Sequence, residues 1–164
     1  TIPHNLNKMK HILYILSFAL LSLLYISCDK TPKNGALDGQ WQLMEIAEKD
    51  SPTDMDYSRI TYKKDERIYW AFQLDLLNIY TQSGKLNGYT AYSTARFQLA
   101  NGRLRIAPTY IHFDNRDSLL TEPHTTALEP MGIEGNAADF KVETLNSKKM
   151  VLTSEKRSLT FRKF

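Results

Sequence analysis

The fold of this chain is decided by the stretch Arg67-Ile68-Tyr69-Trp70-Ala71-Phe72-Gln73-Leu74-Asp75-Leu76-Leu77-Asn78-Ile79-Tyr80-Thr81. From Ile68 to Leu76 every second residue is apolar, which is typical of a β-strand with one face against a core. Two large apolar residues adjoin at Leu76-Leu77, so we expect a bulge or bend there that turns Leu77 and Ile79 inward. Such bends curl a sheet into a barrel.

The rest of the chain repeats this alternation. Further strands are expected at Tyr89–Leu99, Arg103–Ile106 and Tyr110–Phe113, and around Phe140–Thr144, Met150–Leu152 and Leu159–Phe161. Asn101-Gly102 indicates a tight hairpin with a type I′ turn. Pro108 should end the strand Arg103–Ile106. Turn signals about ten residues apart favour antiparallel strands over βαβ units. The sequence therefore predicts an all-β protein, a small antiparallel up-and-down β-barrel of about eight strands.

Two connections interrupt this pattern. Glu48–Glu66 is polar and rich in aspartate, but Asp54–Arg59 lacks the glycine of a calcium loop, so we expect a solvated loop without metal. Asp114–Asn136 is irregular, and Thr126–Glu129 fits a capping box for one short helical turn that Pro130 should stop. A long connection of this kind in a compact barrel is often a lid or a binding loop.

One strand carries three small residues on its apolar face, Ala91, Ser93 and Ala95, ahead of Phe97. They have two interpretations that the sequence leaves open. They make room for large side chains on the neighbouring strand, or they leave space for a ligand, because barrels of eight strands can be filled or hollow. In the second case, the residues that contact the ligand are Trp70, Phe72, Ala91, Ser93, Ala95 and Phe97.

The N-terminal part has the features of an export signal. Lys8-Met9-Lys10 is basic, Ile12–Ile26 is apolar, and Ser27 is a small residue at a cleavage point. The apolar run is short for a membrane span, which needs about 20 residues. We expect translation to start at Met9 and residues 1–27 to be upstream sequence and signal peptide.

The apolar run ends at Cys28, the only cysteine in the chain, in the sequence Tyr25-Ile26-Ser27-Cys28. This motif resembles a bacterial lipobox, in which the cysteine is lipidated and becomes the mature N-terminus, although Tyr25 departs from the usual aliphatic residue. The alternatives are an ordinary signal peptide and an uncleaved anchor with an incidental cysteine. A lone cysteine in an exported protein cannot form an internal disulfide, and acylation would account for it. Residues 28–36 then form a flexible tether and residues 37–164 one domain.

That domain opens with Gly39-Gln40-Trp41. This Gly-x-Trp motif resembles the first strand of lipocalins, and the whole pattern resembles the lipocalin-like lipoproteins of Bacteroidetes, mostly of undefined function. The resemblance implies a lipid-anchored protein of the cell envelope, at the outer membrane. It also implies an arginine late in the chain, here Arg162, packed over Trp41 where the barrel closes. The tether starts beside Trp41, so the closed end of the barrel should face the membrane.

Several functional classes are disfavoured. The net charge of +3 includes Lys8 and Lys10 of the signal, and no basic stripe indicates nucleic acid as a partner. His112 and His124 lack partners at metal-ligand spacing, and no nucleophile elbow, phosphate loop or dinucleotide fingerprint is present. We therefore expect no enzyme, metal or cofactor.

Two functions remain. The first is binding of a small, largely apolar ligand in the barrel mouth. The alternative is a protein-interaction module of the cell envelope, in which a filled barrel holds the two long loops. The residues themselves do not choose between them.

Overall fold

The computed structural model describes residues 10, 14, 15, 17, 32–86, 89–113, 116–119 and 126–164, without the side chains of residues 86, 89–91, 113, 116 and 117. Residues 1–31 and residues 32–164 are separate units, and the second of these is the barrel. The signal segment and Cys28 thus lie almost entirely outside the described residues.

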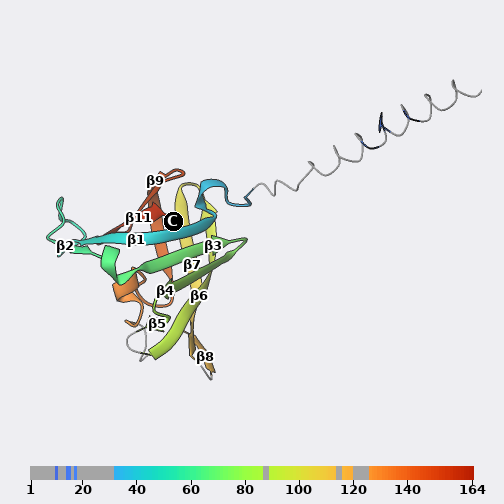
Figure 1. Ribbon diagram of the computed structural model, residues 1–164. Coiled ribbons are helices and arrows are strands. Elements are labelled where there is room, and N and C mark those ends of the chain that lie inside the picture. The colour runs from blue at the N-terminus through green and yellow to red at the C-terminus, as the bar shows by residue number, and fades with distance from the viewer. Residues whose placement is uncertain are drawn as a thin grey trace, which may run out of the picture. The chain divides into compact units, whose positions relative to one another are not determined.

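Eight strands form a closed antiparallel barrel (Figure 1). In order around the barrel they are β1 (Gly39–Glu48), β3 (Ile68–Gln73), β4 (Leu76–Thr81), β6 (Tyr89–Ala100), β7 (Arg103–Phe113), β9 (Ala138–Leu145), β10 (Lys149–Thr153) and β11 (Arg157–Lys163). Each strand pairs with the next along this series, and β1 pairs with β11 to close the ring. The predicted up-and-down barrel is confirmed, and its first and last strands pair antiparallel.

Among the described residues, three short strands lie outside the ring. They are β2 (Arg59–Tyr62) on β1, β5 (Lys85–Leu86) on β6, and β8 (Arg116–Leu119) on β7. β2 falls in the connection predicted to be a solvated loop and β8 in the one predicted to be irregular, so both predictions were incomplete. A four-residue strand with one partner leaves little alternation to detect.

The predicted long strand Arg67–Thr81 is wrong, because it is two strands. The two-residue turn Leu74-Asp75 separates β3 from β4, and Gln73 pairs directly with Leu76. Leu74 has a φ of 58°. This value lies in the left-handed region that favours glycine or asparagine, so the sequence carries no usual turn signal. The expected orientation of Leu77 and Ile79 is nevertheless correct, since both are buried.

The hairpin at Asn101-Gly102 is confirmed, with φ values of 52° and 70°. Positive values at both residues suit a type I′ turn. The strand after it does not end at Pro108 as predicted. β7 continues through Pro108, because the β6–β7 register shifts between Ala95 and Phe97. A residue inside such a shift does not need to donate a backbone hydrogen bond to the neighbouring strand, so a proline is tolerated there.

The described part of the domain also contains three 3-10 turns, η1 (Gly35–Leu37), η2 (Lys64–Glu66) and η3 (Glu129–Met131). The short helical turn in the second long connection is therefore present. It starts at Glu129 and includes Pro130. It has no side-chain cap, so the predicted capping box at Thr126 is wrong.

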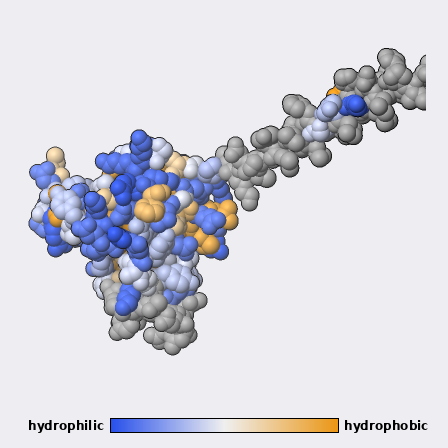
Figure 2. Space-filling view, viewed as in Figure 1, coloured by the Kyte–Doolittle hydropathy of each residue, from blue (hydrophilic) through white to orange (hydrophobic). Residues whose placement is uncertain are grey.

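The barrel has two different ends. The closed end carries η1, with Leu37 buried, and the turns Leu74-Asp75, Asn101-Gly102 and Asn146–Lys148. The open end lies at the other ends of the same strands, near Glu48 and Arg157. Apolar side chains fill the interior, whereas the face in Figure 2 is mostly hydrophilic.

Candidate functional site

The predicted ligand residues lie in the barrel interior. Trp70, Phe72, Ser93, Ala95 and Phe97 are all buried, with exposed fractions between 0% and 8%. The side chain of Ala91 lies outside the described residues, although its backbone pairs with that of Phe113. β3, β4, β6 and β7 are consecutive around the barrel, so their inward faces converge on one volume.

Aromatic rings occupy much of that volume. Trp70 packs against Phe72, Phe140 and Phe161, with ring centroids 6.2, 6.2 and 4.9 Å away. Phe72 meets Phe97 edge to face at 5.0 Å. This is a favourable arrangement for two rings. At this level of the barrel the small residues of β6 therefore stand opposite a packed aromatic cluster.

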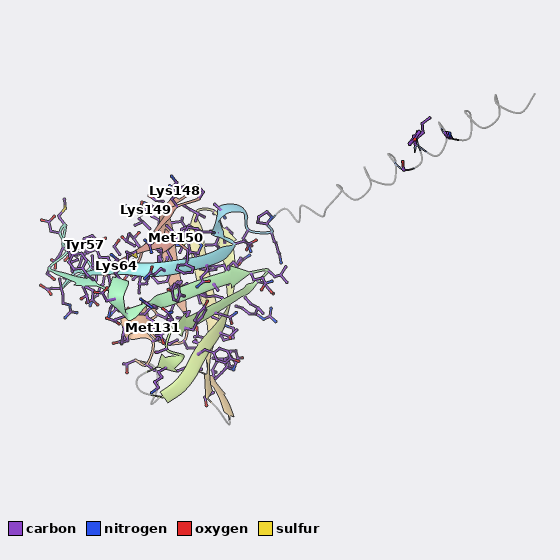
Figure 3. The ribbon with its side chains drawn as sticks, in the orientation of Figure 1. Tyr57, Lys64, Met131, Lys148, Lys149 and Met150 are labelled. Carbon is purple, nitrogen blue, oxygen red and sulfur yellow. The ribbon has the colours of Figure 1, made fainter. Side chains whose placement is uncertain are left out.

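Above this cluster the chain folds over the open end. We call Thr126–Ala137 the covering loop. Three of its side chains, Leu128, Met131 and Ile133, are buried in the same core as the aromatic cluster. Met131 is labelled in Figure 3. The indole Nε1 of Trp70 donates a hydrogen bond to the carbonyl of Met131 at 3.0 Å. This bond satisfies a donor that would otherwise be buried without a partner.

The covering loop fits the barrel closely at Gly132. Its φ is 97°, and a Cβ atom there would lie 2.9 Å from Leu159 Cδ1 and 3.4 Å from Trp70. Only glycine combines that backbone conformation with that approach. Sequence reasoning identified this connection as a lid or binding loop but missed its contacts. The available signal was the group of large apolar residues around Pro130.

The hydroxyl of Thr109 is a buried polar group on the inner face of β7. Thr109 is fully buried, pairs with Ala95 across the β6–β7 ladder, and its Oγ1 forms no hydrogen bond within the described part of the chain. By contrast, Ser93 Oγ donates to the carbonyl of Tyr110 at 2.8 Å. An unsatisfied buried hydroxyl costs about 1–3 kcal/mol. Thr109 can exchange one hydrogen bond with a ligand or a water.

An ion-pair network joins the covering loop to the rim of the barrel. Arg157, at the start of β11, contacts Glu48 of β1 at 2.7 Å and Glu134 of the covering loop at 2.9 Å. Arg59 of β2 donates to the other oxygen of Glu48. Burial alone would raise the pKa of Glu48, but hydrogen bonds and charges from Arg59 and Arg157 outweigh it and hold that pKa below its ordinary value.

A surface cleft of about 820 Å³ opens beside this network, between residues 132–141 and the β10–β11 turn at residues 153–157. Its walls carry Arg103, Lys141 and Lys156 together with Glu134 and Asp139. Arg103 already pairs with Asp139 at 2.9 Å. The mixture of signs gives this cleft no preference for a strongly charged ligand.

At the closed end, the structure corrects the predicted contact of Arg162 with Trp41. The cation over the Trp41 ring is Lys163, whose Nζ lies 4.3 Å from a ring centroid of the indole. Arg162 points to the other face of β11 and donates to Gln42 Oε1 at 2.8 Å. The alternation of β11 could have indicated Lys163, because this residue shares the face of Leu159 and Phe161. It also pairs directly with Trp41.

Gly39 and Trp41 meet at Lys163. Gly39 has a φ of 106°, and a Cβ there would lie 3.2 Å from Lys163 Nζ. That ammonium donates to the carbonyls of Ala36 and Asp38, and Trp41 Nε1 donates to the carbonyl of Leu37 at 2.8 Å. Burial lowers the pKa of Lys163, and the charge of Asp38 partly offsets this. The Gly-x-Trp motif thus seals the closed end.

Two other kinds of feature are absent from the described residues. They contain no group of three or more histidine, cysteine, aspartate or glutamate residues that could hold a metal ion. Among the same residues, no helix has the length and apolar character needed to cross a membrane.

Comparison with solved structures supports this barrel. The chain is similar to a lipocalin-like protein from Bacteroides uniformis, with 20% identity, a TM-score of 0.54, and coverage of 79% of this chain and 100% of that one. It is also similar to an uncharacterized protein from Bacteroides eggerthii, with 22% identity, a TM-score of 0.50, and coverage of 78% and 99%. At these identities the likeness shows the fold alone.

Comparison with curated proteins gives no match. The model of the lipocalin-like domain family, in contrast, matches residues 20–164, which is most of the chain and all of the barrel. With its closed antiparallel barrel of eight strands, this chain belongs to the lipocalin-like domain family.

Proposed function

We propose that this protein binds a small, largely apolar molecule with one polar group inside the open end of the barrel. The observation that carries the proposal is Thr109 Oγ1, a buried hydroxyl without a partner among the described residues, on the inner face beside Ala95. An apolar ligand that presents a hydroxyl or carbonyl oxygen would form a hydrogen bond with this atom and pack against the small side chains of β6. Entry requires the covering loop to lift Met131 away from Trp70.

The test is Thr109→Val, which keeps the shape of the side chain and removes the hydroxyl. Native mass spectrometry of the delipidated wild-type protein from its own host should detect a bound small molecule. The variant should bind it about 5- to 13-fold more weakly, because one hydrogen bond contributes about 1–1.5 kcal/mol. Thr94→Val is the matched control, because Thr94 lies on the outer face of the adjacent strand β6 and contacts Asn78. No bound mass and no uptake of an apolar probe by the wild type would refute ligand binding.

We further propose that the protein is attached to a membrane of the cell envelope, at the outer membrane, through acyl chains on Cys28. The export-type segment and its single cysteine support this, and two or more acyl chains would make the attachment durable. The test is incorporation of labelled fatty acid, which Cys28→Ser should abolish. Equal labelling of the wild type and the variant would contradict the assignment.

A second candidate function is protein binding, and one surface favours it. Met55, Tyr57, Ile60 and Tyr62 are exposed on β2 and the loop before it, with Met55 at 92% and Tyr62 at 75%. β2 pairs only with β1 in the described chain, so its other edge can accept a strand. A cross-linked envelope partner lost in Tyr62→Ser, but kept in Thr109→Val, would support this function over ligand binding.

A further inference from the structure

The closed end of the barrel exposes apolar side chains at one turn. Leu74, in the turn between β3 and β4, is 60% exposed, and Leu76 at the start of β4 is 38% exposed. Figure 2 shows apolar surface at this part of the barrel, near the residues that begin the described domain. The neighbouring Arg96, which pairs with Asp75, is also exposed, so a cation stands beside the two leucines.

Leu74 is an unusual residue for its position, because its φ of 58° is in the left-handed region. A residue with a Cβ is disfavoured there, because the Cβ comes too close to the following carbonyl oxygen. A large apolar side chain at an exposed position of this kind gains nothing from the core, and its backbone conformation destabilises the turn. Such a conflict between local sequence and local structure is characteristic of functional sites.

The turn is fixed next to the point where the domain connects to the rest of the chain. Asn34 Nδ2 donates a hydrogen bond to the carbonyl of Leu74 at 2.7 Å. Only residues 27–31 separate the apolar segment Ile12–Ile26 from Pro32. The connection formed by residues 27–31 spans at most roughly 20 Å. Attachment through Cys28 or through the apolar segment, as proposed above, would therefore keep Leu74 close to the membrane surface.

The charges at this end suit an anionic lipid surface. Lys33 precedes Asn34. Lys148 ends the β9–β10 turn and Lys149 begins β10, at the same end of the barrel (Figure 3). All three are exposed and have no ion pair within the described part of the protein. Basic residues close to a membrane are attracted to anionic headgroups.

We propose that the closed end is a membrane-contacting surface, in which Leu74 and Leu76 enter the interfacial layer of a phospholipid bilayer and the three lysines face its anionic headgroups. The inference rests on the membrane attachment proposed above and adds a second contact to it. It orients the barrel with its covering loop away from the bilayer, where a ligand could enter from the aqueous phase.

The test uses the membrane-attached protein in vesicles of phosphatidylethanolamine and phosphatidylglycerol. A fluorescent label is attached at Leu76→Cys in one sample and at Met55→Cys in another. Met55 lies at the opposite end of the barrel, so it is the matched control. Lipids with a spin label near the headgroup should quench the fluorescence at residue 76 and leave that at residue 55 unchanged. Adding Leu74→Asn should reduce the quenching at residue 76, since asparagine adopts the same backbone conformation without the apolar side chain.

Equal quenching at the two positions, or none at residue 76, would overturn the membrane-contacting surface. Mass spectrometry of the peptide that contains Cys28 separates this result from a failure of lipidation, because that peptide carries either acyl chains or the label. If Cys28 takes the label, the comparison is repeated with Cys28→Ser and the chain held by its apolar segment. The quenching then decides the surface contact independently of acylation.

Discussion

The contact of Lys163 with Trp41 gives the most direct test of how the barrel closes. Lys163→Met keeps an apolar stem of similar length and removes the ammonium, whose Nζ lies 4.3 Å from the ring centroid. The change deletes a cation–π contact worth about 0.5–2 kcal/mol. It also leaves the carbonyls of Ala36 and Asp38 without this donor. Water can replace part of that loss, so we expect the free energy of unfolding to fall by about 2 kcal/mol.

The assay is urea denaturation of the barrel, with Trp41→Phe and the double variant completing a double-mutant cycle. We expect a coupling energy of about 1 kcal/mol between Lys163 and Trp41. Arg162→Met is the matched control, because Arg162 contacts Gln42 on the outer face. Its effect should add to that of Trp41→Phe within about 0.5 kcal/mol. A coupling for Arg162 in place of Lys163 would refute the assignment of faces on β11.

Three further predictions test the covering loop, the ion-pair network and the tether. Gly132 combines a left-handed backbone with a Cβ position 2.9 Å from Leu159 Cδ1, whereas Gly135 has a φ of 67° and open space around it. Gly132→Ala should lower the free energy of unfolding by about 2–3 kcal/mol and Gly135→Ala by only about 1 kcal/mol. Equal losses in urea titrations would argue against close packing of the loop. Because the pKa of Glu48 is lowered in the folded state, its stabilisation is complete above the ordinary value of 4.5 and is lost as the pH falls through the folded-state pKa. Thermal melts of Glu48→Gln should therefore depend less on pH below this ordinary value than those of the wild type, and parallel curves would contradict this. Cys28→Ser should leave the melting temperature of the barrel unchanged, because residue 28 precedes the unit Pro32–Phe164, and a shift of several degrees would show that the tether contributes to the fold.

Much of the fold could be read from local patterns. Alternating apolar residues indicated antiparallel strands, Asn101-Gly102 marked its hairpin, and the spacing of turns indicated the up-and-down barrel. These features depend on residues close together in the chain, where side-chain direction follows from the period of a strand. The break in the long stretch at Leu74-Asp75 escaped this reasoning, because a leucine in a left-handed conformation has no local signal.

The candidate site depended on tertiary structure. Sequence reasoning placed Trp70, Phe72, Ser93, Ala95 and Phe97 on inward faces. The carbonyl of Met131 that meets the indole of Trp70 comes from a residue 61 positions later in the chain. Nor did alternation reveal Thr109 as a buried hydroxyl without a partner in the described chain, since the register shift beside Pro108 determines which way it faces.

By itself, then, the sequence determined that this chain forms an antiparallel up-and-down barrel, because strand period and turn chemistry are local properties. Only the tertiary structure decided that Lys163 covers Trp41, that Leu128, Met131 and Ile133 of the covering loop fill the open end, and that Leu74 is exposed beside Asn34. These contacts join residues distant in the chain. Their geometry follows from strand register and loop packing, which no short stretch of sequence specifies.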